Sequence, residues 1–147
     1  MTCLGDVNFW VALSLDDHVH HAAAANWLRE TQDDDVAFCR VTQKGFLRLL
    51  TNPHVMKGEP FTAQEAWRSY DTLRSNRRIW FADEPPGLEQ EWRAATQHVR
   101  KGPNFWTDAY LAAFAEAAGF VVLTFDRELA RRAGSHAQLL AAPDAIQ

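Results

Sequence analysis

Short apolar segments with the composition of strands alternate with longer segments of helical periodicity along most of this chain. The clearest strand is FVVLTF (120–125), which is rich in β-branched and aromatic residues and lies between Gly119 and Asp126. The segment before it, 105–118, has the apolar spacing of a helix and ends at Gly119, a favourable C-cap. Strands that alternate with helices are joined by crossover connections, which predicts a parallel sheet covered on both faces.

The same alternation predicts the other elements. Further strands are expected at 1–5, 36–41 and 79–82. Helices are expected over 7–15, 18–31, 42–52, 63–75, 88–99 and 126–133, with turns such as 101–104 between elements. The predicted class is therefore α/β, a three-layer α/β/α arrangement around four or five short parallel strands.

Length and composition indicate one folded domain, spanning 1–147, since no repeat or linker interrupts the 147 residues. The six tryptophans are expected in its core. Cys3 and Cys39 are too few for a disulfide framework or a cysteine zinc site, and Cys39 is expected to be a small buried residue. Without a signal peptide or a membrane-length apolar run, a cytoplasmic location is expected. The net charge of −4 excludes binding of nucleic acid by bulk positive charge alone.

Three aspartates are the strongest candidates for chemistry. Asp6 and Asp126 each follow a predicted strand, where either could serve simply as a helix N-cap. Asp108 lies in the first turn of the helix at 105–118, where Thr107 is the expected N-cap. There the Asp108 carboxylate could simply interact favourably with the positive end of the helix dipole. That helix leads directly into the strand before Asp126, so all three carboxylates are expected at one sheet edge, where parallel α/β sheets carry their sites.

Such a carboxylate cluster favours a divalent metal ion. Like charges held together cost free energy unless a cation neutralises them, and hard oxygen ligands select Mg²⁺ or Mn²⁺. A metal bound there would activate water and stabilise the charge that develops on a phosphodiester. Arg127, Arg131 and Arg132 follow Asp126 and would form either a solvated face or, for Arg127 and Arg131, contacts to phosphates.

Other side chains offer weaker signals. His18, His20 and His21 lie together without a metal-binding spacing, so we expect surface or helix-start residues, with a metal role as the lesser alternative. No glycine-rich phosphate loop or serine nucleophile motif is present in the sequence.

At these residues the sequence resembles the PIN-domain ribonucleases, in particular the VapC-type toxins of bacterial toxin–antitoxin pairs. The similar segments are LGDVNFWVAL (4–13), HVHHAAAANWL (18–28), VTQKGFLRLLTNP (41–53) and TDAYLAAFAEAAGFVVLTFDREL (107–129). The resemblance implies a PIN-like fold and a Mg²⁺- or Mn²⁺-dependent endoribonuclease that cleaves structured RNA such as tRNA or rRNA. It also implies a small VapB-like antitoxin partner and, commonly, a homodimer. The lack of a membrane-length apolar run predicts no membrane association.

Carried over by position, Asp6, Asp108 and Asp126 match the family's acidic site residues, and Asn8 and Thr124 match frequent polar companions. The family usually has a fourth acid, a glutamate, where this chain has Gly45. Two nearby residues, Gln43 and Asp83, could compensate. Three carboxylates suffice to hold one metal ion and leave open whether a second one binds.

Two other functions are compatible with the same pattern. The missing glutamate favours a PIN-like module that binds RNA or a protein with little catalysis. A receiver-type phosphoacceptor domain also has an aspartate after a strand, but it needs a lysine at a later strand end. Lys44, Lys57 and Lys101 are poorly placed for that role.

Overall fold

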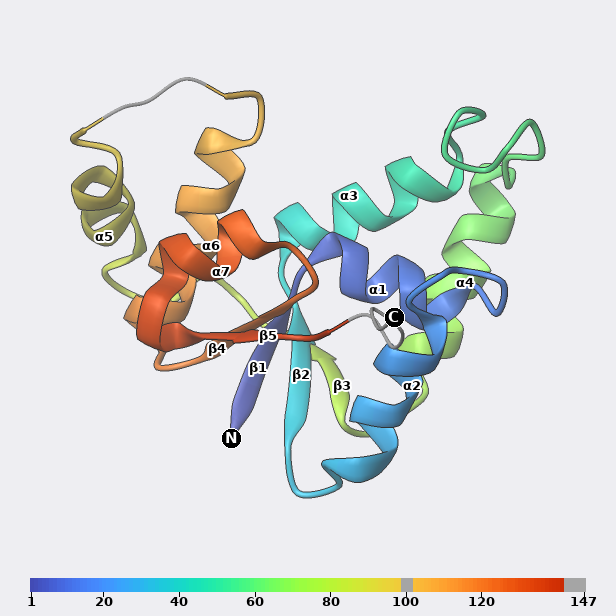
Figure 1. Ribbon diagram of the computed structural model, residues 1–147, viewed down its shortest axis with the longest axis horizontal. Helices are drawn as coiled ribbons and strands as arrows, with labels where there is room; N and C mark the ends of the chain where they lie inside the picture. The colour runs from blue at the N-terminus through green and yellow to red at the C-terminus, as the bar shows by residue number, and fades with distance from the viewer. Residues whose placement is uncertain (99–101, 142–147) are drawn as a thin grey trace.

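A single parallel sheet forms the centre of the computed structural model, which describes residues 1–98 and 102–141 (Figure 1). Its strands are β1 (Thr2–Gly5), β2 (Asp35–Phe38), β3 (Ile79–Phe81), β4 (Val121–Thr124) and β5 (Ala137–Leu139). Their spatial order is β3-β2-β1-β4-β5, so β1 lies in the middle. Leu4 of β1 pairs with Ala37 on one side and with Val122 on the other. The start of the chain and a segment well over 100 residues later therefore lie side by side, as the aspartate prediction requires.

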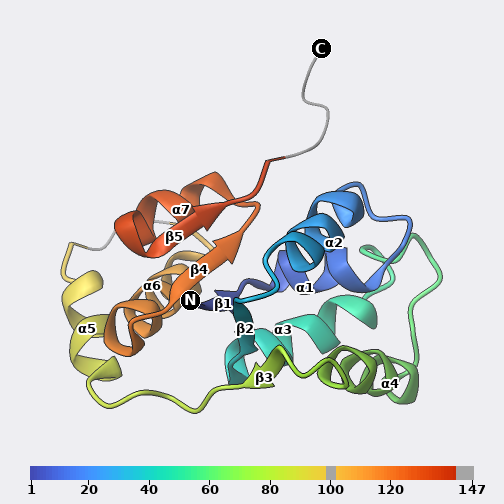
Figure 2. The same ribbon diagram turned by 90° about the horizontal axis from the view of Figure 1, so that it is seen from below.

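Helices cover both faces of this sheet, which confirms the three-layer α/β/α arrangement (Figures 1 and 2). They are α1 (Val7–Ser14), α2 (His21–Glu30), α3 (Arg40–Leu50), α4 (Ala63–Arg74), α5 (Leu88–Ala95), α6 (Phe105–Ala118) and α7 (Arg127–Ala133). The first four helices lie on one side and the last three on the other, as Figure 2 shows. Each group of helices forms a hydrophobic core with one face of the sheet. Neighbouring residues of β1 point into different cores: Cys3 packs with α1–α4, and Leu4 packs with α5–α7. Within the described residues, every helix is too short or too polar to span a bilayer.

The end of β1 is fixed by an aromatic contact. The Trp10 indole stacks on Phe38 with 3.8 Å between ring centroids, and its Nε1 donates to the carbonyl of Gly5 at 3.0 Å. A Cβ on Gly5 would lie 2.6 Å from the indole ring, so only glycine fits there. This packing determines where the next residue, Asp6, leaves the sheet.

Several boundaries differ from those predicted. The second helix begins at His21 rather than at residue 18, because a turn precedes it in which the His20 amide donates to His18 Nδ1. The second strand ends at Phe38 rather than at residue 41, because Cys39 takes the N-cap position of α3 and its amide donates to Thr42 Oγ1. The helix from residue 88 ends at Ala95, and residues 99–101 of that prediction and of the next turn lie outside the described residues.

The prediction that all tryptophans are core residues is wrong for two of them. Trp10 and Trp27 are buried, but Trp67 on α4 and Trp106 on α6 are 48% and 58% exposed. Each exposed ring packs edge-on against a neighbouring aromatic ring, Tyr70 for Trp67 and Trp92 for Trp106. An indole is large enough to make such contacts and still present a face to solvent.

Candidate active site

Asp6 lies at the junction of β1 and α1. Its backbone amide continues the sheet by donating to the carbonyl of Leu123, and its side chain caps α1 by accepting the amide of Val7 at 2.7 Å. The other carboxylate oxygen accepts a hydrogen bond from Thr124 Oγ1 at 2.8 Å. Asp6 is therefore a helix cap, as one interpretation predicted, and it is also a buried carboxylate held by β4.

The hydroxyl of Thr124 connects two of the aspartates. Besides donating to Asp6, it accepts the backbone amide of Asp126 at 2.9 Å. The Asp126 side chain then caps α7 by accepting the amide of Glu128 at 2.8 Å. Because Thr124 is fully buried, its hydroxyl fixes the two acidic residues relative to each other.

Asp108 reaches the same region from α6. The helix begins at Phe105, with Asn104 at the N-cap position, so the prediction that Thr107 is the N-cap is wrong. Thr107 is instead a residue of the first helical turn, because the helix starts three residues earlier than a cap at that position requires. Asp108 lies one turn after Asn104 and is only 8% exposed. The start of α6 therefore presents an amide and a carboxylate on one face.

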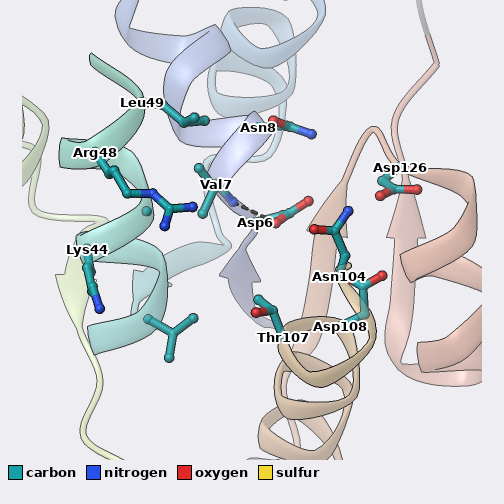
Figure 3. Close-up of a pocket in the computed structure, with 12 residues that line it drawn as sticks. Asp6, Val7, Asn8, Lys44, Arg48, Leu49, Asn104, Thr107, Asp108 and Asp126 are labelled. Carbon is teal, nitrogen blue, oxygen red and sulfur yellow. Dashed lines mark hydrogen bonds between the residues drawn. The ribbon is translucent and has the colours of Figure 1, made fainter. Parts of the chain in front are cut away.

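One pocket of about 440 Å³ collects these side chains (Figure 3). Asp6, Asp108 and Asp126 lie on one side of it, together with Asn104 and Asn8. Helix α3 forms the opposite side. The remaining lining residues are Val7, Val41, Lys44, Gly45, Arg48, Leu49 and Thr107. The structure thus brings the three predicted aspartates to a single cavity beyond the carboxyl ends of β1 and β4.

The carboxylates of the pocket affect one another's protonation. The pKa of Asp108 is raised to about 6, by burial first and then by the negative charges of Asp126 and Asp6. Burial also raises the pKa of Asp6, against the hydrogen bonds from Thr124 and Val7, which lower it. A cation among these groups would favour their ionised forms, so the electrostatics of this wall suit a divalent ion.

The donor set also fits such an ion. Three carboxylates, with the amide oxygens of Asn104 and Asn8 beside them, offer the hard oxygen ligands of Mg²⁺ and Mn²⁺. Among residues 1–98 and 102–141, no three His, Cys, Asp or Glu side chains already have the spacing of ligands around one ion. The fit therefore lies in the chemistry and the shared pocket, and the side chains would have to draw together around the metal.

The residues suggested as substitutes for a fourth acid do not line the pocket. Gln43 is buried elsewhere, and its side-chain oxygen accepts a hydrogen bond from Arg40 at 2.6 Å. Asp83 is exposed after β3 and is not among the residues that line the pocket. A Cβ on Gly45 would lie 2.6 Å from Val7 Cγ2, so α1 and α3 pack too closely there for a glutamate.

Other candidates also lie outside the cavity. Arg127 and Arg131 do not line it, and Arg131 pairs with Glu128. The ring of His20 stacks on Phe125 at 4.3 Å between centroids, while His21 Nδ1 lies 2.9 Å from the carbonyl of Ala12. Those contacts agree with the helix-start interpretation of the histidines. Cys39 is fully buried, as expected.

Sequence reasoning missed four polar residues of the pocket: Asn104, Thr107, Lys44 and Arg48. Two spacings could have indicated three of them. Asn104 precedes Asp108 by four residues, and Lys44 precedes Arg48 by four, so each pair shares a helix face.

Comparison with known proteins agrees with this geometry. The family model of the PIN domain matches residues 4–135, a span that contains all three aspartates. The chain belongs to the PIN-domain family. Ribonuclease VapC41 of Mycobacterium tuberculosis is 43% identical to this PIN domain over 143 residues, covering 94% of this chain and 98% of the relative.

Solved structures show the same fold at much lower identity. The VapBC2 structure from Rickettsia felis, bound to a DNA fragment from its promoter, matches with a TM-score of 0.69 and 15% identity, covering 95% of this PIN domain and 99% of that chain. VapC20 of Mycobacterium tuberculosis, a sarcin–ricin loop cleaving toxin, matches with a TM-score of 0.60 and 19% identity, covering 88% and 93%. These two matches show the fold, and the VapC41 relative together with the PIN-domain model assigns the chain to the VapC branch of PIN-domain ribonucleases.

Proposed function

We propose that this PIN domain is a Mg²⁺- or Mn²⁺-dependent endoribonuclease and the toxin of a VapBC-type toxin–antitoxin pair. Its substrate would be a structured RNA, tRNA or rRNA. The observation that carries the proposal is the pocket in which Asp6, Asp108 and Asp126 converge from three separate segments of the chain. Relatives named as VapC ribonucleases support the nuclease assignment over a module that only binds RNA.

The residues have distinct parts in this proposal. Asp6 and Asp108 would be the principal metal ligands, and Asp126 a further ligand or the group that orients the attacking water. Thr124 holds the Asp6 carboxylate through its hydroxyl, while Asn8 and Asn104 offer amide groups at the rim. A bound divalent ion supplies an activated water and stabilises the charge that develops on the scissile phosphate.

Incubation of the purified protein with total RNA tests this activity. We expect cleavage with Mg²⁺ or Mn²⁺, and its loss in EDTA and in the Asp6→Asn variant. Asp83→Asn is the matched control, because it removes an exposed carboxylate that does not line the pocket. Cleavage that persists equally in EDTA, or in Asp6→Asn, would exclude a metal-dependent site at these residues.

The proposed partner is a small VapB-like antitoxin protein, with a homodimer of this chain as the toxin unit. The VapBC2 neighbour supports the partner. A short reading frame immediately upstream of the gene is the candidate. We expect its product to copurify with this chain and to suppress RNA cleavage, and light scattering of the free toxin would give the mass of two chains. A monomer, or an upstream product without effect on cleavage, would contradict this assignment.

A further inference from the structure

The two sides of the pocket carry opposite charge. Asp6, Asp108 and Asp126 form the acidic wall, whereas Lys44 and Arg48 of α3 line the opposite one (Figure 3). We call Lys44 and Arg48 the α3 cation pair. The metal chemistry proposed above uses only the acidic wall, so the cation pair has no part in it.

Local stability does not explain the α3 cation pair. The two residues are four apart on one helix, a spacing at which like charges destabilise the helix slightly. Both are exposed, and neither forms an ion pair within the part of the chain that the structure describes. Arg40, one turn earlier, differs: it donates to Gln43 and lies over the ring of Phe81. The α3 cation pair is therefore free to bind a ligand.

Close packing holds α3, which carries this pair, against the start of α1. Gly45 follows Lys44 directly, and the position of its missing Cβ lies 2.6 Å from Val7 Cγ2. Val7 is in turn the neighbour of Asp6. Figure 3 shows the guanidinium of Arg48 extending from α3 toward Val7 at the start of α1. Because glycine lets the two helices approach, α3 and the cation pair that it carries lie beside the start of α1, where Asp6 is the N-cap.

A phosphodiester suits a pocket of this kind. We propose that Lys44 and Arg48 bind the RNA backbone in the pocket, holding a phosphate between the α3 cation pair and the acidic wall. Arg48 offers a planar fork of donors for two phosphate oxygens, and Lys44 offers a compact charge beside it. This inference rests on the proposed ribonuclease function and assigns two substrate-binding residues to it.

The test measures RNA binding without turnover. Fluorescently labelled bulk tRNA is titrated in EDTA at several KCl concentrations, with fluorescence anisotropy as the readout. We expect Lys44→Ala and Arg48→Ala each to weaken binding roughly tenfold at low salt. Each should also make the slope of log affinity against log salt concentration shallower by about 0.7 to 0.9. Arg48→Lys should keep most of the salt slope and lose part of the affinity, since it keeps the charge and loses the fork.

Arg77→Ala is the matched control, because Arg77 is an exposed arginine just before β3, at the sheet edge opposite the pocket. It should leave tRNA binding unchanged. A second readout, Mn²⁺ titration followed by calorimetry, separates phosphate binding from damage to the pocket. Removal of a nearby positive charge should leave Mn²⁺ affinity equal or increase it, whereas a distorted site would bind Mn²⁺ more weakly.

Two results would overturn the inference: wild-type tRNA affinity and salt slope in both alanine variants, or an equal loss of binding in Arg77→Ala. These outcomes are distinguishable from failure of the proposed function. If the wild-type protein cleaves RNA with Mg²⁺ but the variants bind tRNA normally, only the role of the cation pair is wrong. If the wild-type protein shows no cleavage while the variants lose tRNA binding, the RNA-binding role of the cation pair is supported and the nuclease assignment is wrong.

Discussion

The hydroxyl of Thr124 holds two parts of the pocket at once, since it donates to Asp6 and accepts the amide of Asp126. Thr124→Val keeps the shape of the side chain and removes both interactions. We expect it to lower the free energy of unfolding by about 1–3 kcal/mol, because a buried carboxylate oxygen and a backbone amide lose their partner. Urea denaturation measures this loss. Thr124→Ser, which keeps the hydroxyl, should lie near the wild type, and an equal loss in both variants would show that packing of the methyl group is responsible.

The protonation of Asp108 predicts a pH dependence of stability. Its pKa is about 6 in the folded chain, raised by burial first and by Asp126 and Asp6 next, against an ordinary value of 3.8. The folded state therefore binds this proton more tightly than the unfolded state does. The resulting stabilisation is complete below about pH 4 and is lost as the pH rises through 6, at about 1.4 kcal/mol per pH unit inside this window.

Asp108→Asn isolates this contribution. In EDTA, we expect the variant and the wild type to have similar unfolding free energies near pH 4, and the variant to be the more stable one at pH 7.5. Urea denaturation across this range measures the difference between the two proteins, which cancels most other titrating groups. A variant that is less stable than the wild type at pH 7.5 would contradict the raised pKa.

Some residue-scale features could be predicted from the sequence and others could not. The positions of Asp6 and Asp126 follow from strand ends, because the carboxyl ends of adjacent parallel strands share an edge. The Thr124 hydrogen bonds depend on the register of β1 against β4, which the sequence pattern does not determine. Gln43 is a similar case. It is the sequence neighbour of the pocket residue Lys44, but the sequence does not show that its side chain bonds to Arg40 instead of lining the pocket.

At the scale of elements, the contact between α1 and α3 makes Gly45 unusual. In an ordinary helix interior, Gly→Ala stabilises by about 1 kcal/mol. Here the added methyl would meet Val7 Cγ2 at 2.6 Å. We expect Gly45→Ala to lower the free energy of unfolding by roughly 1–3 kcal/mol, a typical cost of overpacking.

A double-mutant cycle identifies the cause. In a Val7→Ala background the contact is relieved, so Gly45→Ala should become neutral or stabilising, with a coupling energy of about 1–2 kcal/mol. Chemical denaturation of the four proteins gives this coupling. Additive effects of the two substitutions would place the strain at some other contact of Gly45.

Element positions were predicted well where caps are strong and poorly where the signal is weak. Gly119 ends α6 in a left-handed conformation, as the sequence indicated, and a capping box of Thr62 with Glu65 starts α4 close to its predicted position. The edge strand β5 was not located, because its three residues, Ala137–Leu139, lack a β-branched or aromatic pattern. The exposure of Trp67 and Trp106 could not be read from composition, since burial depends on which face of a helix meets a neighbour.

For the whole molecule, the aspartates tie together segments that are distant in sequence. An ion bound by Asp6, Asp108 and Asp126 would connect β1, α6 and the β4–α7 junction. We expect Mn²⁺ at 100 times its Kd to stabilise the chain by about 2.7 kcal/mol at pH 7.5. For a chain of this size, that is a rise in Tm of several degrees.

Thermal unfolding with and without Mn²⁺ measures this effect. Asp6→Asn should show little or no rise in Tm, and Asp83→Asn should behave as the wild type, because Asp83 lies outside the pocket. A similar rise in Asp6→Asn would mean that the ion binds at another place on the chain.

The central position of β1 also has a consequence in time. Asp6 leaves the ribosome near the start of translation. Its partner Thr124 lies 118 residues further along the chain and emerges much later. Until β4 inserts beside β1, the aspartates belong to unconnected stretches and no acidic wall exists. With this topology, the pocket between β1, β4 and α6 can form only after most of the chain has been translated.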